Sequence, residues 1–232
     1  MSDVSPLVSP CPQCGVEHTS MVFSSVNGAL LPGEVEAIIE GTFEQTECRV
    51  CAHRWQPEHE VLYVDLRARH WVVMYPSSAR RGFAQLERAV QRLMETEFAH
   101  APAVVAPALA GVRPRLVFGH HMLAEALRTL KAGQDPALVE AAKLLWVRRN
   151  LSTFLALGPI ELCVEVFEPD RSLTCLPRRL PNGEHLARVQ IPAEVVSEAR
   201  ATRTLIEQSH PALFRQPYVS ACRYLYGDRP AL

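Results

Sequence analysis

The chain has 232 residues, of which 48% are hydrophobic and 21% charged, and its formal net charge is −1. This composition excludes a chain that is disordered throughout, which would carry more charge and fewer apolar side chains. No run of about 18 apolar residues occurs, so no transmembrane helix is expected. Residues 1–10 have neither the basic nor the apolar region of a secretory signal peptide, so we expect a cytoplasmic protein with reduced thiols.

The charges are divided unevenly along the chain. Residues 1–78 carry ten acidic and four basic side chains, whereas residues 79–232 carry fifteen acidic and twenty basic ones. A basic part of a protein can attract a polyanion. Here the acidic and basic side chains are interspersed, which favours ordinary solvated surface charge and leaves nucleic acid open as a partner.

In the first third of the chain the pattern predicts mainly strands. Residues 1–10 are expected to be a flexible tail, because two prolines and three serines disfavour regular structure. A helix is predicted over residues 32–40, with Pro32 in its first position and Gly41 at its C-terminal cap. Strands are predicted over residues 19–26, 42–46, 60–66 and 70–75, followed by a boundary at residues 75–79.

Helical patterns dominate the middle of the chain. Apolar residues repeat at helical spacing over residues 79–99 and 121–132. A further helix is predicted to begin at Pro136, with Asp135 as its N-cap, and its inward face would carry Leu138, Ala142, Leu145 and Trp146. Short strands are predicted at residues 115–118 and beyond residue 159, a hairpin from residues 171–176 and 184–191 around residues 181–183, and a last helix over residues 193–209.

These elements predict an α+β protein. A zinc-ribbon-containing, β-rich module would occupy residues 11–76, after the flexible tail of residues 1–10. A mainly helical segment would follow over residues 77–158, and a small α+β part would form the C-terminal residues 159–232.

Four of the seven cysteines form two C-x-x-C pairs, Cys11 with Cys14 and Cys48 with Cys51. Such a pair turns the chain sharply, so that both sulfurs face one centre, and two pairs supply the tetrahedral set of sulfurs that favours zinc or iron. We expect a zinc site, and a filled four-thiolate site has no open position for catalysis. His18 and His53 lie near the pairs and are expected outside the ligand set.

The segment from Cys11 to Gly15 reads C-P-Q-C-G, and the segment from Cys48 to Cys51 reads C-R-V-C. On these motifs the chain resembles the CpXC family, bacterial and archaeal proteins named for paired C-P-x-C motifs. The likeness covers roughly residues 11–150, including 115–143. The second motif departs from the pattern at Arg49 and Ala52, so that knuckle is expected to keep its ligands but to be more mobile or differently shaped. The resemblance implies metal binding and no assigned catalytic activity.

The leading hypothesis for function is a non-enzymatic adaptor or protein-binding module. Zinc would hold an interaction surface, the partner would be another protein or a second copy, and no membrane would be involved. An alternative is a nucleic-acid-associated protein of transcription or translation, because four-cysteine zinc ribbons are frequent in the proteins of these processes. We find no Walker, G-x-S-x-G or H-E-x-x-H motif.

A second alternative is an enzyme of unknown class with a site in residues 113–210. Its candidate groups are His120, His121, Glu161 and Glu165. We expect the two histidines to lie in a solvated loop. The two glutamates are expected on an exposed face of a sheet, where they would be about 13 Å apart and too distant from each other for a typical acid–base pair. Cys163 and Cys175 are expected to be buried free thiols.

Overall fold

The computed structural model of the chain describes residues 2–103, 106–180 and 183–226. It divides the chain into two compact units, Met1–Leu127 and Arg128–Leu232, and the boundary falls within helix α4 (Gly119–Lys131). The α+β prediction is confirmed: a strand-rich N-terminal part with clustered cysteines precedes helices and a small sheet. Among the described residues no helix is both long and apolar enough to span a bilayer.

A four-stranded sheet forms the centre of the first unit, with the strand order β3-β6-β7-β8. Its strands are β3 (Ser25–Asn27), β6 (Val61–Asp65), β7 (His70–Tyr75) and β8 (Arg113–Phe118). β6 and β7, the strands predicted over residues 60–66 and 70–75, pair as an antiparallel hairpin, whereas β3 runs parallel to β6 and β7 runs parallel to β8. Parallel neighbours need crossover connections. The connection from β3 to β6 contains helix α1 (Pro32–Glu40). The connection from β7 to β8 contains the 3₁₀ helix Ser77–Gly82, α2 (Phe83–Ala99) and α3 (Ala106–Leu109).

Helix α1 forms as the sequence predicts. Pro32 begins it, and Gly41 ends it in the left-handed conformation, with φ of 77°. The backbone N–H groups of Thr42 and Phe43 both donate to the carbonyl of Ala37, which ties the following loop to the last turn. Ile38 is buried and anchors the helix. Local capping signals therefore decide where this helix begins and ends.

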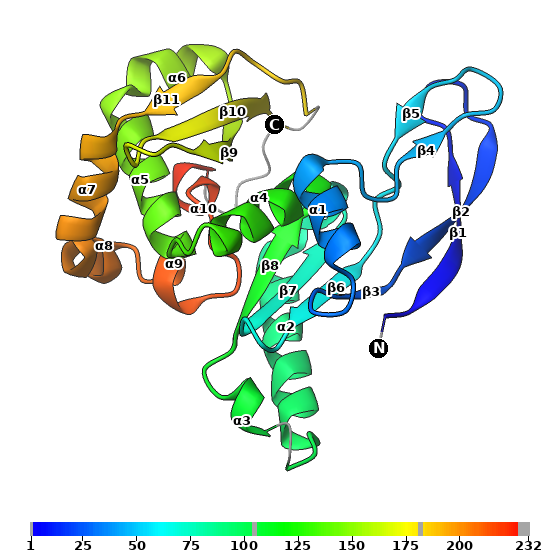
Figure 1. Cartoon of the computed structure of the whole chain (residues 1–232). Coiled ribbons are helices and arrows are strands. Elements are labelled where there is room, and N and C mark those ends of the chain that lie inside the picture. Colours follow the sequence, from blue (N-terminus) through cyan, green and yellow to red (C-terminus); the bar gives the residue numbers. More distant parts are fainter. Residues whose placement is uncertain (1, 104–105, 181–182, 227–232) are drawn as a thin grey trace. The chain divides into compact units, whose positions relative to one another are not determined.

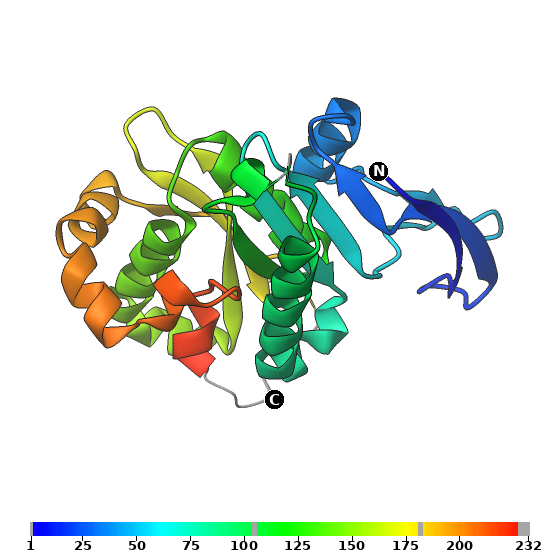
Figure 2. The ribbon, with the colours of Figure 1, turned by 90° about the horizontal axis from the view of Figure 1, so that it is seen from below.

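Two hairpins, which we call the arm, extend from this sheet. β1 (Val4–Pro10) pairs antiparallel with β2 (Glu17–Phe23), and β4 (Thr46–Glu47) pairs antiparallel with β5 (Arg54–Trp55). Figures 1 and 2 show the β1–β2 hairpin projecting from the sheet that contains β3, with β4 and β5 beside its far end. The hydroxyl groups of Ser20 and Thr46, 2.9 Å apart, connect the two hairpins.

Two local predictions in the arm are wrong. The expected tail over residues 1–10 is a strand from Val4 to Pro10, because its two prolines lie in a two-stranded hairpin, where the outer edge of a strand needs no hydrogen-bond donors. The expected strand over residues 42–46 shortens to Thr46–Glu47, because Glu44 takes a left-handed φ of 54° that interrupts the extended chain.

The second unit packs helices against a three-stranded antiparallel sheet with the order β11-β10-β9. Its strands are β9 (Ile160–Phe167), β10 (Leu173–Arg179) and β11 (Val189–Ile191), so the predicted hairpin pairing is confirmed. Pro181 and Asn182 of its predicted turn lie outside the described residues. The helices are α5 (Pro136–Arg149), α6 (Leu151–Leu157), α7 (Ala193–Ala201), α8 (Arg203–Ser209), α9 (Ala212–Arg215) and α10 (Cys222–Tyr226).

Helix α5 lies at the centre of the second unit's core. Asp135 caps it as predicted, with its Oδ1 atom accepting from the N–H of Ala137 at 2.9 Å. The predicted inward face is wrong in part: Leu138, Leu145 and Trp146 are only partly buried. Most sides of the helix are buried because it packs against α7, α9 and β11. Its own buried residues are Ala137, Val139, Glu140, Ala141, Ala142, Lys143, Leu144 and Val147.

One further difference and one confirmed expectation concern the C-terminal third. The predicted helix over residues 193–209 is divided into α7 and α8 at Thr202, whose hydroxyl donates to the carbonyl of Glu198 at 2.8 Å. A threonine hydroxyl that bonds back to the preceding turn competes with the continuing helix. Cys163 and Cys175 are buried free thiols on neighbouring strands, as expected.

Candidate metal centre

The four cysteines of the two pairs meet at the end of the arm. Cys11 follows β1, and Cys48 follows β4, so each hairpin carries one pair in its turn. All four sulfur atoms lie within 4.8 Å of one another. The Sγ atoms of Cys11 and Cys51 are 3.7 Å apart, and those of Cys14 and Cys48 are 3.5 Å apart. The two hairpins therefore converge on a single centre.

The two knuckles have the same backbone turn. The N–H of Cys11 donates to the carbonyl of Val16, and the N–H of Gly15 donates to the carbonyl of Cys11. The second knuckle repeats both bonds, from Cys48 to His53 and from Ala52 back to Cys48. The expectation of a differently shaped second knuckle is therefore wrong. Ala52 adopts a left-handed φ of 56°, close to the 75° of Gly15, and so takes the place of glycine.

The spacing of the sulfurs fits a tetrahedral metal ion. Zinc binds thiolates at about 2.3 Å, which places two ligands of a tetrahedron about 3.8 Å apart. The observed separations of 3.7 and 3.5 Å are close to this value. The donor set is four thiols and no carboxylate, which suits zinc or iron rather than magnesium or calcium. Cys11, Cys14, Cys48 and Cys51 can thus hold a metal ion.

The thiols of this cluster differ in their pKa values. Burial raises the pKa of the Cys48 thiol, but N–H groups of Cys51 and Val50 outweigh it and lower that pKa to about 5. The N–H of His53 lowers the pKa of Cys51, yet burial and the sulfurs of Cys48, Cys14 and Cys11 raise it to about 12. Four thiols at this distance cannot all ionise without a compensating positive charge, which a divalent cation supplies.

A histidine and a tryptophan lie beside the cluster. The Nε2 atom of His18 is 3.2 Å from the Sγ atom of Cys48, so this ring hydrogen-bonds a sulfur ligand. The ring of Trp55 is half-buried and meets His18 edge-on at 5.3 Å and His53 face-on at 6.3 Å. Both predicted accessory histidines therefore lie at the site without replacing a cysteine in the cluster.

Glu44, a buried carboxylate at the base of the arm, is not among the residues predicted from the sequence. Glu44 accepts hydrogen bonds from the N–H of Phe23 at 2.5 Å and from Nε2 of His59 at 2.7 Å. The side chains of Glu44 and His59 are 4% and 12% exposed. Glu44 thus joins the end of β2 to the segment before β6. No sequence signal links residues 15 apart in irregular chain, so only the structure reveals this contact.

The family comparison agrees with this geometry. The model of the family described as CpXC protein matches residues 10–143, which is more than half of the chain. The chain belongs to the CpXC family. No curated protein and no solved structure matches it.

The CpXC match begins at the first knuckle and ends within α5, at Lys143. Glu140 and Lys143 are 9% and 2% exposed, and the Nζ atom of Lys143 lies 2.5 Å from Oε1 of Glu140. The other carboxylate oxygen of Glu140 accepts from the N–H of Ala221 at 2.7 Å. In this CpXC protein the pair therefore fixes the C-terminal segment against α5.

The groups proposed for an enzyme site in this CpXC chain have surroundings that the sequence did not indicate. His120 lies in the first turn of α4, 8% exposed, and its Nε2 atom donates to the carbonyl of Pro57 at 3.0 Å, so the solvated-loop expectation is wrong. Glu161 is 3% exposed because the start of β9 is buried on both faces. Glu165 is paired with Arg188 on the surface. His121 is half-buried beside His120.

Proposed function

We propose that this CpXC protein is a zinc-stabilised binding module of the cytoplasm, in which the metal holds the arm as a surface for a protein partner. One observation carries the proposal: a four-sulfur cluster joins the turns of the two hairpins that form the arm. Zinc is the proposed ion because closed four-cysteine sites of this kind are its usual structural sites. None of the seven cysteines, all within the described residues, forms a disulfide, which is usual for proteins of a reducing compartment.

A structural role follows from the ligand set. Four thiolates fill the tetrahedral coordination of the ion and leave no position for a substrate or a reactive water. The short strands β4 and β5 contribute four residues in total to their hairpin, which is too little to be stable alone. The metal therefore supplies the free energy that keeps the arm ordered.

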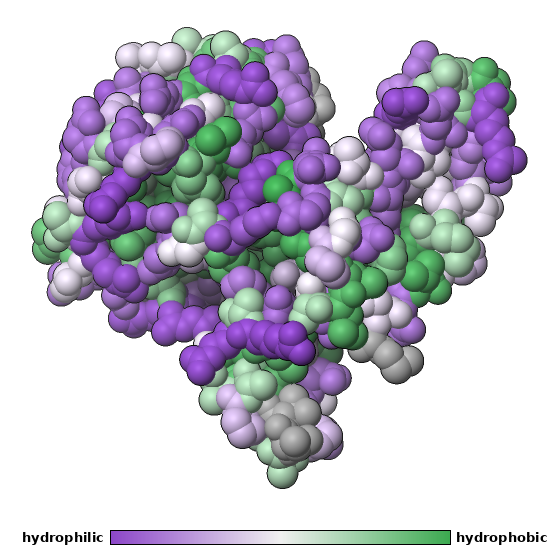
Figure 3. Space-filling model, in the orientation of Figure 1, coloured by the Kyte–Doolittle hydropathy of each residue, from purple (hydrophilic) through white to green (hydrophobic). Residues whose placement is uncertain are grey.

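The arm presents apolar side chains to solvent. Val8 is 59% exposed, Met21 62% and Val50 69%. In the β1–β2 register Pro6 faces Met21, so Pro6, Val8 and Met21 lie on one face of the hairpin. Figure 3 shows green, apolar areas among the polar surface of the arm. Contiguous exposed apolar residues on one element are typical of a protein-binding surface.

Site-specific crosslinking in the full-length protein tests the proposal. A photoreactive amino acid replaces Met21 or Val50, and the matched control replaces Leu155, which is 73% exposed on α6. We expect one partner of defined mass at both arm positions, resistant to nuclease, lost after metal chelation and missing at position 155. Capture that nuclease abolishes would favour the nucleic-acid alternative. Equal crosslinking at all three positions, or none at the arm, would overturn the proposal.

A further inference from the structure

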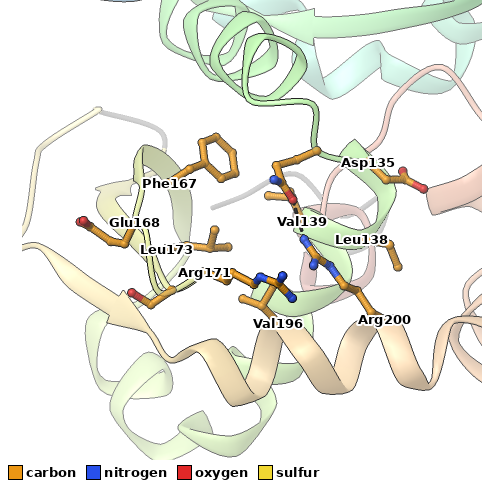
Figure 4. A pocket seen from close by; sticks show the side chains of 11 residues that line it. Asp135, Leu138, Val139, Phe167, Glu168, Arg171, Leu173, Val196 and Arg200 are labelled. Carbon is orange, nitrogen blue, oxygen red and sulfur yellow. Dashed lines mark hydrogen bonds between the residues drawn. The ribbon is translucent and has the colours of Figure 1, made fainter.

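The second unit contains a small pocket. Its lining residues are distant in sequence from the four cysteines of the metal centre, and none of them belongs to that centre. The pocket lies between the start of α5, the turn that joins β9 to β10, and α7 (Figure 4). Its cavity has a volume of about 60 Å³. Apolar side chains form its walls: Leu138, Val139, Phe167, Leu173 and Val196.

Two arginines line the same pocket. In Figure 4 the guanidinium groups of Arg171 and Arg200 reach into its middle, whereas the carboxylates of Glu168 and Asp135 point away from it. Asp135 is paired with Arg203 at 3.0 Å, and Glu168 accepts from the hydroxyl of Thr174 at 2.7 Å. Neither carboxylate therefore pairs with the two guanidinium groups, which belong to exposed residues that line the pocket.

Arg200 is partly held in place by a neutral neighbour. Its Nη2 atom donates to Oε1 of Gln134, another lining residue, at 2.6 Å. A guanidinium group has five N–H donors, so this single bond leaves donors of Arg200 available to a ligand. The charge of Arg200 is likewise not compensated by an acidic side chain among its described contacts.

Arg171 has a left-handed backbone conformation. Its φ is 71°, in the left-handed region where glycine is favoured. The turn is held by bonds from the N–H of Arg171 to the carbonyl of Glu168 and from the N–H of Glu168 to the carbonyl of Ser172. The side chain of Arg171 is thus carried by a tight turn whose residues line the pocket. Among the described residues, none forms an ion pair with Arg171.

We propose that this pocket binds a small carboxylate whose short apolar part contacts Leu138, Phe167 and Val196, with Arg171 and Arg200 holding the carboxylate. The planar guanidinium fork matches two carboxylate oxygens. The cavity of about 60 Å³ is far below the roughly 300–1,000 Å³ of pockets for larger ligands, which excludes a nucleotide. The apolar walls favour a carboxylate with a hydrocarbon tail over a free inorganic anion.

Titration of the ¹⁵N-labelled full-length protein with butanoate, followed by NMR at constant ionic strength, tests this site. We expect saturable shifts at the amides of Arg171, Ser172 and Val196. Acetate, which lacks the tail, and inorganic phosphate should bind at least fivefold more weakly, and butylamine should not bind. Arg171→Ala and Arg200→Ala should each weaken butanoate binding about tenfold, whereas Arg215→Ala, on α9 outside the pocket, should leave it unchanged.

A second variant separates loss of binding from loss of folding. Arg171→Gly removes the guanidinium group and also relieves the left-handed backbone, so its melting temperature should equal or exceed that of the wild type while butanoate binding weakens about tenfold, as in Arg171→Ala. The proposal is overturned if butanoate gives no saturable shift, if phosphate binds as tightly, or if Arg171→Gly binds butanoate as the wild type does.

Discussion

Gly15 and Ala52 hold equivalent positions in the two knuckles, and both have a left-handed backbone, with φ of 75° and 56°. Each donates its N–H to the carbonyl of the first cysteine of its pair. The side chain of Ala52 makes this conformation costly, whereas Gly15 adopts it freely. The second knuckle therefore contains a local strain that the converging sulfurs hold in place.

We expect Ala52→Gly to raise the free energy of unfolding of the metal-loaded protein by about 0.5–1 kcal/mol. Relief of the left-handed strain, about 1–2 kcal/mol, exceeds the entropy that glycine adds to the unfolded chain. Gly15→Ala is the matched opposite change and should destabilise by about 1 kcal/mol, because an added Cβ meets no atom within 4 Å and only the backbone is strained. Denaturant unfolding at saturating metal measures both. Stabilisation by both changes would contradict the common turn.

The metal should control the order of the arm. We expect one equivalent of zinc in the purified protein, and Cys48→Ser should release it, because three thiolates hold zinc less tightly than four. Cys175→Ala, outside the cluster, should retain the metal. Metal analysis combined with hydrogen exchange checks this. Chelation should remove the protection of β2 and β4 and leave that of α5, whereas unchanged protection of the arm would show that the metal does not order it.

The Glu44–His59 pair should make stability depend on pH. Burial lowers the pKa of His59, but the hydrogen bond and charge of Glu44 outweigh it and hold that pKa above its ordinary value. The stabilisation is therefore complete below the unfolded-state pKa, about 6.5, and is lost as the pH rises through the higher folded-state pKa.

The Glu44→Gln variant isolates this contribution. At pH 6 the unfolding free energy of the wild type should exceed that of Glu44→Gln by about 1.5–3 kcal/mol, the usual size for a hydrogen bond to a charged group. This difference should shrink as the pH is raised to about 9. Both proteins share the pH dependence of the cysteine cluster, so it cancels in the comparison. A difference that stays constant or grows with pH would rule out the ion pair as its source.

The buried Lys143–Glu140 pair should be sensitive to loss of either partner. Lys143→Met should destabilise the protein by about 3–5 kcal/mol, because it leaves a buried carboxylate without its cation. Adding Glu140→Gln should recover part of this loss, since the amide oxygen still accepts from the N–H of Ala221. A double-mutant cycle on unfolding free energies measures the coupling. Strictly additive losses would mean that the two side chains do not stabilise each other.

Residue patterns along the chain predict most local elements of this protein and the four cysteines of its candidate metal centre. The paired cysteines, the ends of α1 and the cap of α5 were all predictable, because each depends on residue types within a few positions of one another. The strands β6 and β7 were predictable for the same reason. The segment that matches the CpXC family, residues 10–143, contains both cysteine pairs.

Which side chains are buried and which distant residues meet depends on the packing of the whole fold. The strand at Val4–Pro10 needs β2 as its partner, and the burial of His120 and Glu161 depends on the elements packed around them. The contact of Glu44 with His59 and the pocket that contains Arg171 join segments without any shared periodicity. Burial depends on long-range packing, which overrides local propensity, so these features became visible only in the folded chain.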